Sequence, residues 1–276
     1  MRTLSVEQND QSWMNSSAPS PEQMKRKILL DEESVGCGEF VFGYAELEPG
    51  CKLPLHMNAQ PQCDYIIQGR AWVQLGRRRV ELSRDSATYF PPNVPHSYEV
   101  VGNETLCLAY TFACEKKGQR ILDTPATREE ANRFDIDNMW QTRWAVADDF
   151  VPWELWEPSK GKRGMTWKTI FDENHGGCKS MLFGTCFLPP GCRYSRHTHA
   201  QPEIYYCFAG RGEIFVGDTT VDVQAGTAVY VPRGVIHGAQ NRSAAPMQMI
   251  WVYGTESTSG EWSWTPAEDV YLEAQS

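Results

Sequence analysis

An internal repeat at a constant offset constrains the fold of this chain more than any other feature. The offset from His56 to His197 is 197 − 56 = 141, and the same offset joins His96 to His237. It also relates Gly50, Cys51, Gln62, Gly69 and Pro91 to Gly191, Cys192, Glu203, Gly210 and Pro232. An ungapped repeat of this length indicates two equivalent domains in tandem.

The second copy of the repeat contains side chains that can bind a metal. Alternate residues of a strand share a face, so His197 and His199 should point the same way, and we expect Glu203 to join them on one wall. A turn at Pro232–Gly234 lets the next strand return with His237 facing inward. Three imidazoles and one carboxylate suit one divalent transition metal, Fe2+, Mn2+, Ni2+, Co2+ or Zn2+, and leave coordination positions open for a substrate.

The spacing of these residues resembles the paired motifs of the cupin superfamily. The first block reads G(X)5HXH(X)3E(X)6G from Gly191 to Gly210, and the second reads G(X)5PXG(X)2H(X)3N from Gly226 to Asn241. The resemblance implies an all-β bicupin, with two tandem cupin barrels of the double-stranded β-helix or jelly-roll type. Short segments rich in Val, Tyr, Phe, Ile and Thr, separated by Gly and Pro, favour the same fold class.

The first copy does not repeat the whole ligand set. Asn58 stands at the position of His199, and Gln62 stands at the position of Glu203. Amides are poor ligands beside imidazole and carboxylate, so we expect the first barrel to hold metal weakly or not at all. The alternative is a substrate pocket lined by His56, Asn58, Gln62 and His96.

The pattern along the chain predicts four segments. These are a disordered or extended tail (1–25), the first cupin barrel with its degenerate site (26–114), a linker with a short helix (115–165) and the second barrel with the metal site (166–276). The helix should open at Thr127, with Glu130 completing a capping box. Aromatic residues crowd the linker and should pack it onto the barrels, namely Trp140, Trp144, Trp153 and Trp156.

Composition bears on location and partners. The nine cysteines contain no CxxC pair, which is more typical of a reduced cytosolic protein than of a disulfide scaffold. The stretch from Met1 to Ser20 lacks the apolar core of a secretory signal, and no stretch is long enough to span a membrane. The net charge of −9 argues against a nucleic-acid partner. We expect a cytoplasmic protein with a small-molecule substrate, and a homodimer formed through strand edges is one expected arrangement.

Two tyrosines flank the expected ligands. Tyr205 shares the strand face of Glu203, whereas Tyr194 needs a loop or bulge to turn inward. Each of the two could instead be a buried tyrosine whose hydroxyl bonds to the backbone. The combined set resembles the site of the cupin dimethylsulfoniopropionate lyases and their relatives, with matching residues Tyr194, His197, His199, Glu203, Tyr205 and His237.

That closer resemblance implies β-elimination, with a tyrosinate removing a proton next to a metal-bound carboxylate and Tyr205 as the better-placed base. The broader prediction is a metal-dependent lyase or isomerase that abstracts a proton from a small carboxylate or carbonyl substrate. A non-heme Fe(II) dioxygenase is the first alternative, because the same ligands suit ferrous iron. A non-catalytic small-molecule-binding bicupin is the second. Oxygen consumption separates the two enzymes, and metal content separates both from the binder.

Overall fold

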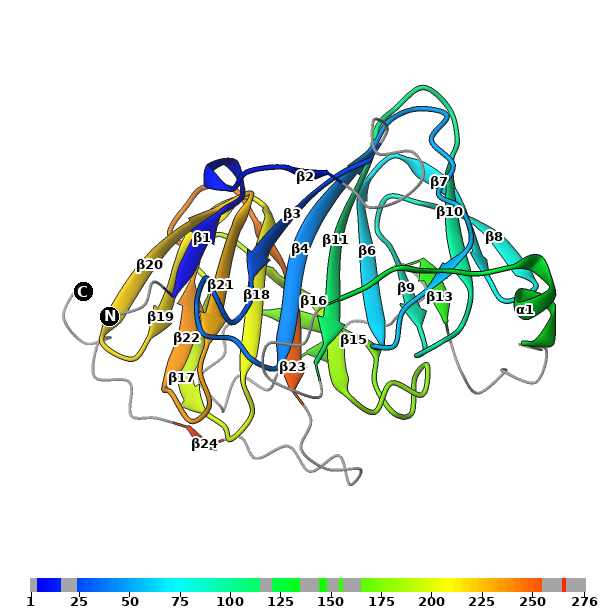
Figure 1. Ribbon diagram of the computed structural model, residues 1–276. Helices are drawn as coiled ribbons and strands as arrows, with labels where there is room; N and C mark the ends of the chain where they lie inside the picture. Colours follow the sequence, from blue (N-terminus) through cyan, green and yellow to red (C-terminus); the bar gives the residue numbers. More distant parts are fainter. Residues whose placement is uncertain are drawn as a thin grey trace.

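The chain folds into two β-barrels that lie side by side (Figure 1). A computed structural model describes residues 4–15, 24–114, 121–134, 144–147, 154–155, 165–254 and 265–266. Each barrel pairs one seven-stranded sheet with one five-stranded sheet, and neighbouring strands are antiparallel. The predicted all-β fold of two tandem jelly-roll barrels is therefore confirmed.

The first barrel is built mainly from consecutive strands of the first repeat. Its seven-stranded sheet contains, in order, β13 (Ala145–Ala147), β9 (Ser86–Phe90), β6 (Gln62–Gln68), β11 (Leu106–Ala113), β4 (Phe40–Leu47), β3 (Met24–Leu30) and β2 (Met14–Asn15). Its five-stranded sheet contains β12 (Thr124–Pro125), β5 (His56–Met57), β10 (His96–Val100), β7 (Arg70–Leu75) and β8 (Arg78–Ser83).

The second barrel repeats this arrangement. Its seven-stranded sheet contains β1 (Ser5–Glu7), β21 (Thr227–Val231), β18 (Glu203–Ala209), β23 (Met247–Gly254), β16 (Met181–Leu188), β15 (Thr166–Phe171) and β14 (Glu154–Leu155). Its five-stranded sheet contains β20 (Thr219–Gln224), β19 (Arg211–Val216), β22 (His237–Gln240), β17 (Arg193–Thr198) and β24 (Thr265–Pro266).

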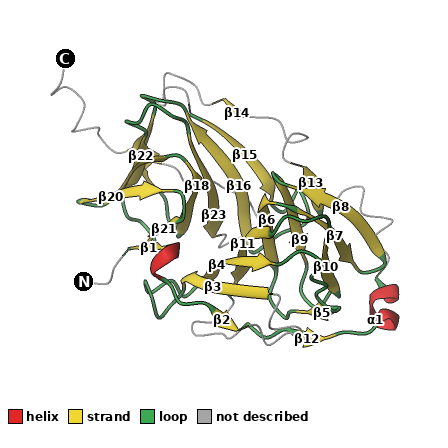
Figure 2. Cartoon of the chain, turned by 90° about the horizontal axis from the view of Figure 1, so that it is seen from above, coloured by secondary structure: helices red, strands yellow, loops and turns green. Residues whose placement is uncertain are grey.

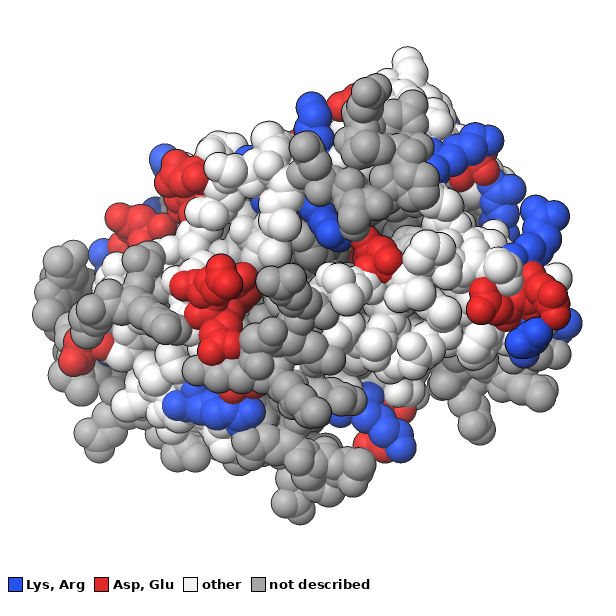
Figure 3. Space-filling model, in the orientation of Figure 1, with Lys and Arg blue, Asp and Glu red and all other residues white. Residues whose placement is uncertain are grey.

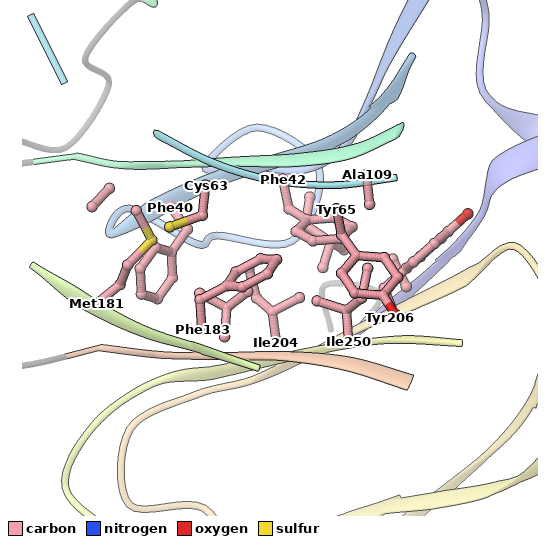
Figure 4. Close-up of a cluster of buried hydrophobic side chains, with 14 of the residues drawn as sticks. Phe40, Phe42, Cys63, Tyr65, Ala109, Met181, Phe183, Ile204, Tyr206 and Ile250 are labelled. Carbon is pink, nitrogen blue, oxygen red and sulfur yellow. The ribbon is translucent and has the colours of Figure 1, made fainter. Parts of the chain in front are cut away.

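The two seven-stranded sheets pack against each other, so both of their faces are buried. Every residue of β11 is buried, as expected for a continuous apolar run with no solvent face. On β23, Met249 and Trp251 point into the second barrel, whereas Ile250 and Val252 point toward the first. Figure 4 shows the layer between the barrels, where Phe40, Phe42, Cys63, Tyr65 and Ala109 meet Met181, Phe183, Ile204, Tyr206 and Ile250.

The barrels exchange edge strands. Strand β1 precedes the first barrel but pairs with β21 of the second, with Ser5 opposite Val229 (Figure 1). Strand β13 precedes the second barrel but pairs with β9 of the first, with Ala145 opposite Thr88. Thr88 and Val229 are equivalent residues of the repeat, since 229 − 88 = 141. Each barrel is therefore completed by the segment that leads into the other.

This exchange bears on the amino-terminal tail (1–25), which the sequence predicts to be disordered or extended. Its described part is extended at Ser5–Glu7, continues through a 3-10 turn at Gln8–Asp10 and forms β2, so of the two expected states these residues take the extended one. The amide of Tyr230 donates to the Leu4 carbonyl at 2.8 Å, and the amide of Gln8 donates to the Gly226 carbonyl at 2.8 Å. A segment this short, held by pairing with a distant strand, has no hydrophobic periodicity, so the sequence pattern does not reveal that it forms a strand.

A second pair of short strands covers the edges that carry the repeat histidines. Pro125 of β12 lies opposite His56, and Pro266 of β24 lies opposite His197. The offset of the repeat also relates these two prolines, since 266 − 125 = 141, and both lie in the sequence Thr-Pro-Ala. The repeat is thus longer than the motif blocks indicate, and each barrel is closed at this edge by the segment that follows it.

The linker contains the predicted helix α1 (Arg128–Arg133). Thr127 caps it by accepting a hydrogen bond from the Glu130 amide at 3.2 Å, and the Glu130 carboxylate accepts one from the Thr127 amide at 2.7 Å. The capping box is therefore confirmed. Trp144 packs against the core of the first barrel, as expected, whereas the other linker tryptophans, Trp140, Trp153 and Trp156, lie outside the described residues.

The described surface carries both signs of charge. On the face in Figure 3, basic side chains are interspersed with acidic ones.

All nine cysteines are thiols, in agreement with the absence of a disulfide pattern in the sequence. No helix within the described ranges has the length and apolar character needed to cross a bilayer. In the view from above, β13 lies beside the first barrel and β1 beside the second (Figure 2).

Val6→Pro should destabilise the protein by disrupting the exchanged strand. Val6 shares strand parity with Leu4 and Gln8, so its amide faces β21, and proline removes that donor. Leaving the opposite carbonyl unpaired should cost about 1–3 kcal/mol and lower the Tm measured by calorimetry. The matched control is Ser5→Pro, whose amide points away from β21. Equal losses in the two variants would contradict the proposed pairing role.

Candidate metal centre

The structure brings the four predicted ligands together at one end of the second barrel. His197 belongs to β17, His199 follows that strand directly, and Glu203 and His237 are the first residues of β18 and β22. Their candidate ligand atoms, one from each side chain, all lie within 4.8 Å of one another. All four side chains are buried. The sequence prediction that these residues converge is therefore correct in geometry.

One detail of that prediction is wrong. His197 and His199 lie on the side of the five-stranded sheet, but Glu203 begins the seven-stranded sheet, so the carboxylate does not share their wall. The turn at residues 200–202 carries the chain across the barrel, because the proline at its end favours an extended start of β18 rather than a continuation of β17. The carboxylate therefore faces the imidazoles from across the barrel end.

Backbone carbonyls fix the orientation of all three imidazoles. The Nδ1–oxygen distances are 3.0 Å for His197 and the Ser195 carbonyl, 2.8 Å for His199 and the Gln201 carbonyl, and 2.9 Å for His237 and the Val235 carbonyl. A carbonyl can only accept, so each Nδ1 must carry the hydrogen. In the neutral imidazole, Nε2 then presents a lone pair, which is the arrangement that metal-ligating histidines require.

The resulting donor set fits a cation. The Nε2 atoms of His199 and His237 lie 3.2 Å apart, and the Glu203 Oε2 lies 3.2 Å from the first and 2.9 Å from the second. Three lone-pair-bearing atoms at these distances repel one another unless positive charge lies among them. Nitrogen and carboxylate ligands of this kind suit a divalent transition metal.

The Glu203 carboxylate is held in its charged form. Desolvation by burial opposes ionisation, but hydrogen bonding and positive charge on the side of His199 and His237 outweigh it and keep the pKa of Glu203 well below its usual range, and a cation bound among these atoms would act in the same direction. The site therefore offers a negative charge as well as three nitrogen ligands.

Tyr194 turns toward the site through a β-bulge, as its position in the sequence requires. The register between β17 and β22 shifts between Tyr194 and His197, and the two rings lie 4.4 Å apart. Gly238 makes room for the bulge, because a Cβ atom at this position would lie 2.7 Å from the Tyr194 carbonyl oxygen. A bulge of this kind re-aims a side chain that strand parity would otherwise direct outward.

Tyr205 places a buried hydroxyl beside the ligands. Its ring centroid lies 6.3 Å from that of His237, and the hydroxyl has no hydrogen-bond partner among the described residues. Burial raises the pKa of Tyr205 well above its ordinary value, and the charge of Glu203 and the proximity of Tyr194 raise it further. The alternative in which this hydroxyl bonds to the backbone is therefore not observed. An unpartnered buried hydroxyl is the kind of group that a ligand completes.

Sequence reasoning missed two residues that support His199. The Tyr253 ring packs against the His199 ring at 4.3 Å, and its hydroxyl donates to the Gln201 side-chain oxygen at 3.0 Å. Gln201 in turn supplies the carbonyl that fixes His199. Strand parity placed Tyr253 on one face of β23 without showing that this face lines the barrel, so the contact could not be predicted.

The first barrel keeps the histidine geometry without the metal-ligand set. Nδ1 of His56 lies 3.0 Å from the Pro54 carbonyl, and Nδ1 of His96 lies 2.9 Å from the Val94 carbonyl. Asn58, at the position of His199, donates instead to the Asp123 carboxylate at 3.0 Å. Within the described residues, the grouped His, Cys, Asp and Glu side chains that could hold a metal are those of the second barrel.

A carboxylate is present in the first barrel, but it lies two residues further along. Asp64 occupies the position of Tyr205 and is 1% exposed. It accepts hydrogen bonds from Gln62 Nε2 at 2.8 and 3.0 Å and from the Tyr98 hydroxyl at 2.7 Å. Burial raises the pKa of Asp64 to about 7, even though these hydrogen bonds act in the opposite direction.

Comparison with known proteins agrees with the motifs and the architecture. The family model described as "Cupin domain" matches residues 43–112 and 184–253, one stretch in each barrel. The chain belongs to the cupin family. The two matched stretches are related by the offset of the repeat, 184 − 43 = 141, so the family match follows the internal duplication of this cupin.

Two curated relatives match parts of this cupin. Dimethylsulfoniopropionate lyase DddW of Ruegeria pomeroyi is 28% identical over 105 residues, which cover 38% of this chain and 66% of the relative. An uncharacterized protein of Streptomyces coelicolor is 42% identical over 59 residues, which cover 21% of this chain and 56% of the relative. The chain thus spans between about half and two thirds of the length of these relatives.

Solved bicupin structures share the fold over nearly the whole chain. A variant of Bacillus subtilis oxalate decarboxylase superposes with a TM-score of 0.71 at 15% identity, covering 93% of this cupin and 78% of that chain. The formate complex of Lactobacillus farciminis oxalate decarboxylase gives 0.74 at 13% identity, covering 96% and 89%. At these identities the similarity establishes the architecture alone.

Asp64 should make the folded protein less stable as the pH rises from about 4 to about 7. In this window the folded state keeps a proton that the unfolded chain releases, because the pKa of Asp64 is about 7 when folded against a model value of 3.8. This one group should contribute a slope approaching about 1.4 kcal/mol per pH unit. Urea unfolding of wild type and Asp64→Asn across this range isolates the contribution, and identical slopes in the two proteins would refute it.

Proposed function

We propose that this cupin is a metal-dependent enzyme that removes a proton from a small carboxylate or carbonyl substrate in a lyase or isomerase reaction. The observation that carries the proposal is the placement of the Tyr205 hydroxyl. It is buried without a partner among the described residues, beside four side chains whose ligand atoms face one another.

His197, His199, Glu203 and His237 would hold one divalent transition metal. When bound there, such an ion would polarise a substrate carboxylate or carbonyl and make the neighbouring C–H bond more acidic. Four protein ligands leave positions open on a metal that prefers six, so a substrate oxygen can enter. The Nδ1 hydrogen bonds keep the imidazoles in place during this exchange of ligands.

Tyr205 would act as the general base. Without a nearby cation, its raised pKa keeps the hydroxyl protonated, so positive charge in the ligand cluster is needed to make the phenolate accessible. In an elimination, the Tyr205 oxygen takes the proton, the C–H electron pair becomes the new double bond, and the leaving group departs from the β-carbon with its bonding pair. Tyr194 lies on the His197 side of the site, where it would bind and orient the substrate.

The relative named as a dimethylsulfoniopropionate lyase supports the elimination form of this proposal. Sulfonium carboxylates are therefore the first substrates to test, followed by other small carboxylates with a leaving group on the β-carbon. The oxalate decarboxylases share the architecture of the chain and give no preference between reactions.

Purified protein should contain about one equivalent of divalent metal per chain when analysed by inductively coupled plasma mass spectrometry. His237→Ala should lose the metal, because only three of the four ligands would be left and Glu203 would no longer face the His237 imidazole. His96→Ala, the equivalent change in the first barrel, should retain it. Loss of metal in His96→Ala but not in His237→Ala would show that the metal lies in the first barrel and contradict this assignment.

Tyr205→Phe should lower turnover of the active compound by roughly 100-fold or more, the usual effect of removing a general base, with metal content unchanged. Tyr206→Phe is the matched control, because Tyr206 points into the layer between the barrels and donates to Gln8. An oxygen electrode should record no oxygen uptake during turnover. Oxygen uptake that survives Tyr205→Phe would reject the proposal in favour of an Fe(II) dioxygenase.

A further inference from the structure

We propose that the cavity of the first barrel is a second, metal-independent binding site that takes a small organic cation, namely a protonated amine on a short apolar body. This site is distinct from the ligand cluster of the second barrel and does not depend on the reaction proposed for it.

The lining of the cavity is mostly apolar and includes a few polar side chains. It has a volume of about 260 Å³, just below the roughly 300 Å³ at which pockets for drug-sized ligands begin, so it suits a compact molecule. Aliphatic and aromatic side chains form most of the lining, among them Met24, Leu53, Leu108 and Phe112. The polar side chains of the lining include Arg26, His56, Gln62, Asp64, Tyr98 and Asp123.

Gln62 lines this cavity and carries an unpartnered acceptor. Its Nε2 donates to both oxygens of Asp64, which fixes the orientation of the amide. The Gln62 Oε1 is then left buried, with no hydrogen-bond partner among the described residues, on a side chain that is 8% exposed. Because a carbonyl oxygen can only accept, the ligand that completes it must carry an N–H or O–H group.

His96 carries a second unpartnered acceptor, next to the lining residue His56. Its Nδ1 faces the Val94 carbonyl, so a neutral ring presents a lone pair at Nε2. That Nε2 is buried and has no partner within the described part of the chain. The ring lies 4.4 Å from that of His56, which lines the cavity, and stacks on Phe90 at 4.1 Å. Each of these two unpartnered atoms can accept a hydrogen bond from a donor.

The charge balance favours a cation over a neutral donor. Asp64 is buried, and the hydrogen bonds it receives come from neutral groups, Gln62 and Tyr98. Arg26 also lines the cavity, but it pairs with Asp123 at 3.3 Å, so these two charges offset each other. A buried carboxylate whose described partners are all neutral gains most from a positively charged ligand. An anion would meet the Asp64 carboxylate and the Gln62 side chain, whose oxygen can only accept.

The residues at equivalent positions of the repeat explain why the two barrels would bind different classes of ligand. Position 203 supplies a carboxylate and position 205 a phenol in the second barrel, whereas positions 62 and 64 supply an amide and a carboxylate in the first. Asn58 stands where the second barrel has the His199 imidazole, and it donates to Asp123, so one nitrogen ligand is missing. The first barrel thus has a buried carboxylate and an unpartnered amide oxygen in place of a metal-ligand set.

Isothermal titration of the full-length protein with n-butylammonium, n-butanol and butyrate tests the site. We expect saturable binding of n-butylammonium, with weaker binding of n-butanol and none of butyrate. The isosteric Asp64→Asn variant should weaken n-butylammonium binding by at least about tenfold, as expected when one partner of a buried charge pair is removed. Glu203→Gln, which changes the second barrel, should leave the affinity unchanged.

Methyl NMR of protein labelled at methionine locates the ligand even if Asp64→Asn alters stability. The Met24 methyl lines the cavity, whereas Met247 and Met249 lie in the core of the second barrel. Addition of n-butylammonium should shift the Met24 signal and leave the other two in place. Absence of binding, equal affinity for n-butanol, or shifts confined to Met247 and Met249 would each overturn the proposal, and none of these outcomes bears on the metal-dependent reaction.

Discussion

Hydrogen bonds from imidazole Nδ1 atoms to backbone carbonyls determine what each barrel can bind. His56, His96, His197 and His237 each face the carbonyl of the residue two positions earlier, at 2.9–3.0 Å. The bond fixes the tautomer and directs Nε2 inward as a lone pair. In the second barrel a further imidazole and a carboxylate join these atoms, and their mutual repulsion creates a place for a cation. In the first barrel the same bond leaves Nε2 of His96 as an unpartnered acceptor, but the other side chains needed to bind a metal are absent from the described residues there.

The packing of the two barrels holds these groups in position. Along β18, Glu203 and Tyr205 point into the second barrel, whereas Ile204 and Tyr206 pack into the layer between the barrels. The strand that carries the carboxylate and the proposed base is thus fixed on both faces. The exchanged strands β1 and β13 tie each barrel to the segment that leads into the other. The first barrel therefore helps to hold the site of the second barrel in place, whether or not the first barrel binds a ligand of its own.

The sequence predicts the fold class, the two equivalent barrels and the four converging side chains, because all of these depend on motif spacing and strand parity. It also predicts that Tyr194 needs a bulge, although only the structure shows how Gly238 admits one. The crossing of Glu203 to the opposite sheet was missed, since parity does not reveal where a chain changes sheets. The strands at Ser5–Glu7 and Thr265–Pro266 are too short for a periodic signal and exist only through long-range pairing. The burial of Asp64 depends on tertiary packing in the same way.

Binding of one divalent cation in the second barrel, by three Nε2 atoms and one carboxylate, underlies both the proposed reaction and the contrast between the barrels. Anomalous diffraction from crystals of the purified protein, recorded on both sides of the absorption edge of the metal found in it, tests this binding most directly. We predict one anomalous peak bonded to His197, His199, Glu203 and His237, with none in the first barrel. A metal-containing crystal whose peak lies elsewhere, or whose four side chains point apart, would contradict it.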